Sequence, residues 1–199
     1  MSYAIIGFGA IGQAIARAFA RNNIEVTVAS RRAPETLLPQ ARAIGAKVIP
    51  RTLPEALKAD VVILAVRYEG HQDVGKALPD WHGKTVIDAM NTNQPVAELD
   101  GLPSSVFAAR SFPGARYVKG FNHLPAATLA SDPDVGGGHR VVFLSSNDDA
   151  AATQVANLAR QLGFAPVNLG RLEEGGTLVQ ARGKNWAPLI FQDLFKQTA

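Results

Sequence analysis

The sequence predicts an α/β protein built on a doubly wound, mostly parallel sheet. Short apolar runs alternate with segments of helical spacing along the chain, a pattern typical of right-handed strand–helix–strand units. Residues 61–66 form a continuous run rich in β-branched side chains, and residues 85–89 are similar; such runs suit strands buried on both faces of a sheet. A glycine-rich turn at residues 7–12 joins the first apolar run to the first helical segment.

The composition is that of one globular domain, which we expect to span residues 1–199. Of the 199 residues, 47% are hydrophobic and 19% are charged, which is enough apolar side chain for a buried core. No apolar run approaches the roughly 18 residues of a membrane-spanning helix, and no secretory signal is evident, so we expect a cytoplasmic protein with no membrane partner. The absence of cysteine excludes disulfides, thiolate metal sites and cysteine nucleophiles.

The net charge gives little indication of a nucleic-acid partner. Lys and Arg number 20 against 17 Asp and Glu, a net charge of +3, and the basic residues are scattered rather than gathered in a stripe. We therefore expect no nucleic-acid partner. The exception to the scatter is the adjacent pair Arg31 and Arg32, whose position matters more than the total charge.

The elements follow from periodicity and from residues that begin or end helices. Strands are expected at residues 3–6, 24–29, 47–49, 61–66, 85–89, 117–121, 141–144 and 165–169. Helices are expected from residue 11 to the pair Asn22-Asn23, then at 35–44, from about 54, at 71–78, at 148–162 and at 172–197 with a break near Pro188. Thr52 and Glu55 have the spacing of a capping box. We expect Asn147 to cap the helix at 148–162 and the glycine run at 136–138 to be a mobile loop.

The turn Gly7-Phe8-Gly9-Ala10-Ile11-Gly12 has the spacing of the dinucleotide-binding fingerprint. Gly7 permits the tight turn, Gly9 lets the backbone approach a pyrophosphate, and Gly12 lets helix and strand pack closely. The helix would offer its unpaired N–H groups and positive dipole end to the phosphates. A glycine-rich turn with no ligand is the alternative. The context favours a Rossmann-type dinucleotide-binding fold, with residues 1–145 as the dinucleotide-binding core and 146–199 as a C-terminal extension.

The end of the second expected strand indicates which dinucleotide would bind. A site for NAD places Asp or Glu there, about 20 residues after the glycines, to bind the ribose hydroxyls. This chain has Ser30-Arg31-Arg32 instead. Two guanidinium groups and a hydroxyl suit a 2′-phosphate, which a carboxylate would repel. The residues therefore predict NADP(H) rather than NAD(H), the alternative being a solvated basic pair.

The chemistry is expected outside the carboxyl ends of the strands, in the loops after Val66, Ala89, Gly120 and Leu144. His123 is a candidate proton donor because imidazole titrates near neutrality, and a loop histidine bonded to backbone is an equal alternative. Lys184 is a second candidate donor, and Trp186 and Phe191 are expected to be core or lid residues. The four histidines lack the i, i+4 pairing with a carboxylate that indicates a metal site, so we expect no metal.

Several segments together resemble a known family. These are IIGFGAIGQAIARAFARNNIEVTVASRR, VILAVRYEGH, VIDAMN, YVKGFNHLPAATL and QLGFAPVNLG, which cover nearly the whole chain. They resemble the NADP oxidoreductases that depend on the deazaflavin coenzyme F420. They equally resemble the cytosolic oxidoreductase domain of the six-transmembrane epithelial antigen of prostate metalloreductases. Asn122 matches the metalloreductase pattern, whereas the deazaflavin enzymes commonly have His there.

The resemblance implies hydride transfer between NADP(H) and a small-molecule redox partner, a flavin such as FMN or FAD or a deazaflavin such as coenzyme F420. It also implies that the chain can form a homodimer and that the C-terminal extension, residues 146–199, closes the site. Cofactor-binding residues are expected to be Gly7, Phe8, Gly9, Ala10, Ile11, Gly12, Ser30, Arg31 and Arg32 on the phosphate side, and Ala65, Val66, Arg67, Asn91, Asn122 and Pro125 on the nicotinamide side. The alternatives are direct reduction of a small carbonyl or imine, and a non-catalytic NADP-binding regulatory module.

Replacing Arg31 by Ala should raise the Kd for NADPH by about tenfold or more, because a charge-assisted contact to the 2′-phosphate is lost. The Kd for NADH should barely change, since NADH has no 2′-phosphate. Fluorescence titration of the variant with each cofactor measures both constants. Equal effects on the two cofactors would contradict the assignment.

Overall fold

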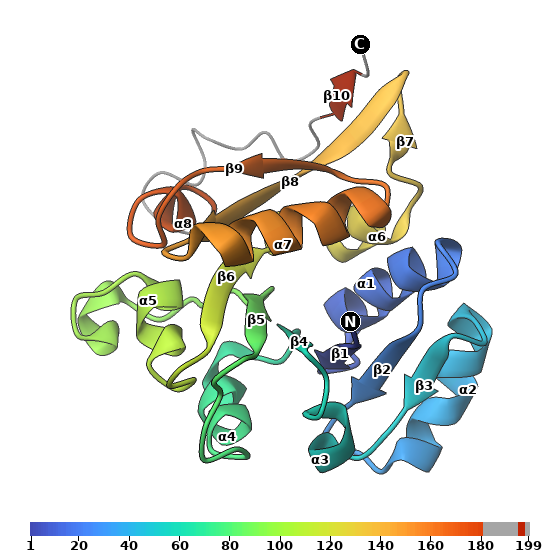
Figure 1. Cartoon of the computed structure of the whole chain (residues 1–199), viewed down its shortest axis with the longest axis horizontal. Helices are drawn as coiled ribbons and strands as arrows, with labels where there is room; N and C mark the ends of the chain where they lie inside the picture. Colours follow the sequence, from blue (N-terminus) through green and yellow to red (C-terminus); the bar gives the residue numbers. More distant parts are fainter. Residues whose placement is uncertain (181–194, 198–199) are drawn as a thin grey trace.

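The computed structural model describes residues 1–180 and 195–197 and confirms the expected α/β architecture (Figure 1). The strand order in the sheet is β10-β8-β6-β5-β4-β1-β2-β3, and β7 and β9 also pair with β8. The section β3-β2-β1-β4-β5-β6 is parallel throughout and has the order of a Rossmann-type fold. The chain order reverses between β1 and β4, so the crevice for a ligand lies at the carboxyl ends of these strands.

The elements alternate along the chain as strand–helix units. The strands are β1 (Tyr3–Ile6), β2 (Val26–Ala29), β3 (Val48–Pro50), β4 (Val61–Leu64), β5 (Thr85–Asp88), β6 (Arg116–Gly120), β7 (Asp134–Val135), β8 (Gly138–Ser146), β9 (Ala165–Asn168) and β10 (Phe195–Gln197). The helices are α1 (Ala10–Arg21), α2 (Pro34–Ile44), α3 (Leu53–Ala56), α4 (His71–Gly75), α5 (Ser104–Ala109), α6 (Ala126–Ala130), α7 (Asp149–Gln161) and α8 (Gly175–Leu178), with short 3-10 turns η1 (Tyr68–Gly70) and η2 (Val96–Leu99).

The sheet is buried on both faces, which explains why its strands are apolar at consecutive positions. Ile5 of β1 packs in the layer that contains side chains of α1, α2 and α7, whereas its neighbours Ala4 and Ile6 pack in the layer with α3, α4 and α5. Phe19 anchors the first layer and Trp81 the second, and each is fully buried. Burial of one such side chain stabilises the fold by about 1.5–3 kcal/mol. Among the residues described, no helix is long and apolar enough to cross a membrane.

The direction of β8 corrects one expectation about the site. β8 pairs antiparallel with β6, with Gly120 opposite Leu144 and Val118 opposite Ser146. The residues after Leu144 therefore lie toward the amino ends of the parallel strands, and the prediction that this loop contributes to the site is wrong. Instead, the first half of β8 continues past Gly120 at the carboxyl edge (Figure 1).

The last described residues of the helix expected at 172–197 form a strand instead. A short helical segment is present as α8, but Phe195–Gln197 forms a strand that pairs antiparallel with β8, so a helix over 172–197 is wrong at that end. Pro188 lies outside the described residues. Of the glycine run at 136–138, Gly136 and Gly137 form the turn of the β7–β8 hairpin, and Gly138 begins β8 opposite Val135. Its mobility stays a prediction.

The ends of three helices show how local sequence sets their limits. Asn23 follows α1 in the left-handed conformation, with φ of 56°. The Glu55 carboxylate accepts hydrogen bonds from the Thr52 N–H and hydroxyl at 2.9 and 2.6 Å, which confirms the link expected from the capping spacing. The prediction that Asn147 caps the next long helix is wrong. Asp148 caps α7 by accepting from the Ala151 N–H at 2.8 Å, and Asn147 accepts from the Leu172 N–H instead.

Replacing Asp148 by Ala should lower the free energy of unfolding by about 1 kcal/mol, because the Ala151 N–H loses its acceptor at the start of α7. Urea unfolding followed by circular dichroism measures the difference. Asp149→Ala is the matched control, since Asp149 is exposed in the first turn and makes only a weaker, dipole-based contribution. An equal loss in the two variants would contradict the capping assignment.

Candidate functional site

The glycine turn lies at the carboxyl end of β1, between the ends of β2 and β4. The Gly7 N–H donates to Ala29 O at 2.8 Å, which joins the turn to β2. Gly7 has a φ of 103°, and a Cβ there would lie 2.3 Å from Ala65 O, so only glycine fits. A Cβ at Gly12 would lie 2.0 Å from Gly7 O. In contrast, a Cβ at Gly9 would meet nothing within 4 Å, so this exposed residue faces open space at the start of α1.

The residues expected to bind a 2′-phosphate lie directly after β2. Ser30 Oγ accepts from the Arg32 N–H at 3.0 Å, which turns the chain at the strand end. The side chains of Arg31 and Arg32 are both exposed at this edge. Arg51, which sequence reasoning did not single out, joins them after β3 because its N–H donates to Val28 O at 3.0 Å. Three arginines therefore follow two adjacent strands, an arrangement suited to an anion.

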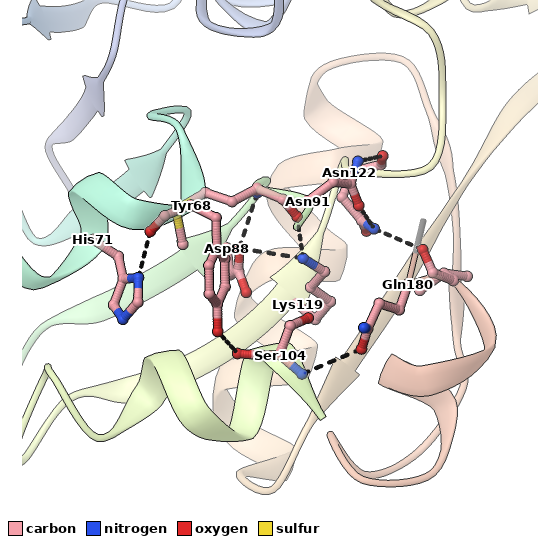
Figure 2. Close-up of polar contacts among 10 residues, drawn as sticks. Tyr68, His71, Asp88, Asn91, Ser104, Lys119, Asn122 and Gln180 are labelled. Atoms are coloured by element: carbon pink, nitrogen blue, oxygen red, sulfur yellow. Dashed lines mark hydrogen bonds and ion pairs between the residues drawn. The ribbon is translucent and has the colours of Figure 1, made fainter. Parts of the chain in front are cut away.

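The loops after β4, β5 and β6 form the other half of the edge. The Ala65 N–H donates to Ile6 O at 2.8 Å, which places Val66 and Arg67 beside the glycine turn. Farther along, two asparagines join the loops after β5 and β6 (Figure 2). Asn91 Nδ2 donates to Asn122 O at 2.8 Å, and Asn122 Nδ2 donates to Asn91 Oδ1 at 3.0 Å and to Val179 O at 2.8 Å.

The backbone at Phe121 explains how Asn122 reaches that position. Phe121 has a φ of 61°, an uncommon conformation for a bulky residue that turns the chain sharply after β6. Its buried ring packs edge-to-face on Phe164 at 6.0 Å. The His123 ring lies 4.8 Å from the ring of Phe143 on β8, and the exposed Pro125 precedes α6 as its N-cap.

A buried ion pair lies beneath the loop after β5. Lys119 Nζ is 3.2 Å from Asp88 Oδ1, and their side chains are 2% and 0% exposed. The ammonium also donates to Met90 O, while the Met90 N–H donates to Asp88 Oδ1 at 2.9 Å. Burial lowers the pKa of Lys119, an effect that the Asp88 carboxylate partly offsets. Burial and, next, the Asp88 charge raise the pKa values of Tyr117 and Tyr68.

A polar pocket of about 490 Å³ opens between the loops after β4 and β5. It is lined by Arg67, Tyr68, Glu69, Asn91, Thr92, Asn93, Gln94, Pro95 and Glu98. The Tyr68 hydroxyl does not face it as a free donor, since it donates to Ser104 O at 2.7 Å. The pocket combines one guanidinium group with two carboxylates and several amides, so it suits a ligand with many hydrogen-bonding groups.

The fold brings most of the expected site residues to one edge, in two groups. The glycine turn and Ser30–Arg32 lie around the ends of β1 and β2, and Arg67, Asn91 and Asn122 lie around the ends of β4, β5 and β6. Lys184, Trp186 and Phe191 lie outside the described residues. In the described ranges, no cluster of three or more His, Asp or Glu residues could hold a metal ion. Sequence reasoning missed Arg51 and the pair Asp88–Lys119, whose signal is a charged residue within each of two largely apolar strands.

Part of the sequence that forms this edge is similar to a known family. The sequence pattern of the family described as NADP oxidoreductase, coenzyme F420-dependent, matches residues 2–92. That stretch runs from β1 past β5 and contains the glycine turn, Ser30–Arg32 and Asn91. Over these residues the chain is similar to this family of NADP oxidoreductases. It is also similar to metalloreductase STEAP2 of Mus musculus, with 33% identity over 117 residues, which are 58% of this chain and 23% of that protein.

The similarity to curated proteins covers only part of their length. Metalloreductase STEAP3 of Rattus norvegicus is 25% identical over 170 residues, which are 84% of this chain and 33% of the metalloreductase. The chain therefore spans about a quarter to a third of the metalloreductases that it matches.

Solved structures of similar proteins extend the likeness to the whole chain. A hypothetical protein, SMa0349 of Sinorhizobium meliloti, is 44% identical with a TM-score of 0.91, covering 99% of this chain and 96% of that one. A proposed F420-dependent NADP-reductase of Arthrobacter sp. fb24 is 26% identical with a TM-score of 0.70, covering 86% of each chain. A reductive aminase of Aspergillus terreus, at 20% identity and a TM-score of 0.65 over 94% of this chain and 60% of that one, shares the fold.

Two glycine variants should separate folding from cofactor binding. Gly9→Ala should leave the Tm nearly unchanged, because its φ of −84° suits alanine and the Cβ enters open space. The same Cβ should weaken NADPH binding by about tenfold or more, because it would occupy the path of the pyrophosphate. Gly12→Ala should lower the Tm strongly, since its Cβ would overlap Gly7 O.

Thermal unfolding with and without NADPH measures both effects. A Gly9→Ala protein that binds NADPH as tightly as the original would contradict the pyrophosphate assignment.

Proposed function

We propose that the chain binds NADP(H) along the carboxyl edge, with the adenosine half at β2 and the nicotinamide half at β4 to β6. The observation that carries the proposal is the open approach to Gly9 beside three exposed arginines at the ends of β2 and β3. A pyrophosphate needs close access to backbone N–H groups at a helix start, and a 2′-phosphate needs fixed cations. The residues present therefore fit NADP(H).

The residues on the phosphate side have separable tasks. The first-turn N–H groups of α1 would bind the pyrophosphate, with Gly7 and Gly12 holding the turn close to the sheet. Ser30, Arg31 and Arg32 would bind the 2′-phosphate, and Arg51 would add a third positive charge from the neighbouring strand. Because Ser30 Oγ already accepts from the Arg32 N–H, its hydroxyl proton is available to a phosphate oxygen.

We propose that the reaction is hydride transfer between NADP(H) and a flavin or deazaflavin, such as coenzyme F420, FMN or FAD. When bound, the nicotinamide supplies the hydride chemistry, and the protein supplies proximity and orientation. Val66 and Arg67 would bound the nicotinamide on the β4 side, and Asn91 and Asn122 on the β5 and β6 side. The 490 Å³ polar pocket beside Arg67 offers hydrogen-bonding groups to the second ring system and its tail.

The C-terminal extension supports a closed site. Asn122 donates to Val179 O, and the Ser104 N–H donates to Gln180 Oε1 at 3.2 Å. These bonds connect residues 179–180 to the loop after β6 and to the start of α5. We propose that residues 146–199 close the site in this way. A homodimer and a cytoplasmic location stay predictions.

Purified protein should oxidise NADPH when offered a flavin or coenzyme F420, because both provide a flat acceptor ring for the hydride. The loss of nicotinamide absorbance is measured with FMN, FAD, coenzyme F420, and a small ketone with and without an amine. Turnover with the ketone or imine alone, lost in His123→Gln, would favour direct reduction with His123 as proton donor. Tight NADPH binding without oxidation by any acceptor would indicate a regulatory module.

A further inference from the structure

The buried pair Asp88–Lys119 has no part in the function proposed above, yet it lies directly beneath the nicotinamide half of the edge. Figure 2 shows the Lys119 ammonium beside the Asp88 carboxylate and near Asn91 of the loop after β5. The same ammonium donates to the Met90 carbonyl. The pair holds both polar groups of the Met90 backbone. Asp88 Oδ1 accepts from its N–H, and Lys119 Nζ donates to its carbonyl. Asn91 is the next residue along the chain.

We propose that Lys119 is a positioning residue for the nicotinamide side of the cofactor, acting through Met90 and Asn91. This rests on the proposed function, which places Asn91 against the nicotinamide half. With Met90 fixed at its N–H and carbonyl, the backbone that carries Asn91 has little freedom. Asn91 in turn bonds to Asn122 through two hydrogen bonds, and Asn122 bonds to Val179 O. One buried ammonium therefore supports a chain of contacts across three loops.

The energetics of the pair favour positioning over stability as its purpose. Removing two charges from water costs several kcal/mol per ion, and the cost is recovered only when the remaining polar atoms are also satisfied. Here they are satisfied only in part. The Tyr117 hydroxyl interacts with the Asp88 carboxylate, and neither Asp88 Oδ2 nor that hydroxyl has a further hydrogen-bond partner among the described residues. An apolar pair of similar volume would serve the core at least as well.

Contact with the reacting atoms is excluded for Lys119 by its burial. Its side chain is 2% exposed, and its ammonium is already directed at the Asp88 carboxylate and the Met90 carbonyl. A lysine so enclosed acts on the site only through the groups that it holds. The effect of removing it should therefore appear in how the nicotinamide half is bound, and not in the binding of the phosphates.

The test compares NADPH with 2′-phospho-ADP-ribose, which has the phosphates but lacks the nicotinamide. Lys119→Met leaves Asp88 buried without its counter-ion and is expected to lower the Tm. The double variant Asp88→Asn with Lys119→Met removes both charges and is expected to recover the Tm, while the Met90 carbonyl stays unsupported. Lys84→Met is the matched control, because Lys84 Nζ donates to Ala59 O at 2.9 Å at the opposite end of β5.

The quantity measured is the ratio of the two Kd values, by calorimetry. In the original protein and in Lys84→Met, NADPH should bind more tightly than the fragment. In the double variant, the ratio of the Kd for 2′-phospho-ADP-ribose to the Kd for NADPH should fall by about tenfold. The Kd for 2′-phospho-ADP-ribose itself should stay unchanged within about twofold. A double variant that keeps the full advantage overturns the positioning role, as does an original protein that shows none. If the original protein binds neither ligand, the proposed function itself fails.

Discussion

The structure depends on how closely helix α1 approaches strand β1 at the glycine turn. A side chain at Gly12 would overlap the carbonyl of Gly7, and one at Gly7 would overlap the backbone of Ala65 after β4. These two contacts fix the start of α1 against the two central strands of the sheet. The same closeness leaves Gly9 exposed at the crevice between them. One backbone path therefore sets the packing through two glycines and leaves an open approach to the third, where we propose that the pyrophosphate binds.

The two halves of the carboxyl edge differ in whether their charged side chains are exposed or buried. At the ends of β2 and β3, three arginines lie exposed on the surface. Water solvates their guanidinium groups there, and an anion can replace that water. At the ends of β5 and β6, one lysine and one aspartate are buried together and directed at the backbone. Exposed cations suit reversible binding of a phosphate, since little desolvation is needed. A buried pair suits a rigid support, because leaving either charge alone is costly.

The sequence was sufficient to predict elements whose signals are local, and insufficient where pairing is long-range. The β-branched run at 61–66 and the capping spacing of Thr52 and Glu55 are signals carried by residues close together in the sequence. The structure has both the strand and the hydrogen-bonded cap. The direction of β8 depends on its partner β6, about 25 residues earlier, and periodicity carries no information on that pairing. The edge residues Arg31, Asn91 and Asn122 follow from the parallel order. The buried pair Asp88 and Lys119 could not be predicted in this way. A charged residue within a strand normally indicates a solvent-exposed position, and only the pairing of β5 with β6 shows that the two charges are buried together.

Phe121 shows what such a site requires of its surroundings. A bulky residue in the left-handed region costs about 1–3 kcal/mol, a penalty kept only where neighbouring structure enforces it. Burying its ring against Phe164 returns about 1.5–3 kcal/mol, which offsets the strain locally. What the turn achieves is the placement of Asn122 between Asn91 and Val179, at the end of β6. A glycine at this position would relieve the strain but would also remove the anchor. The backbone conformation and the aromatic anchor therefore act together to hold the loop after β6 over the crevice.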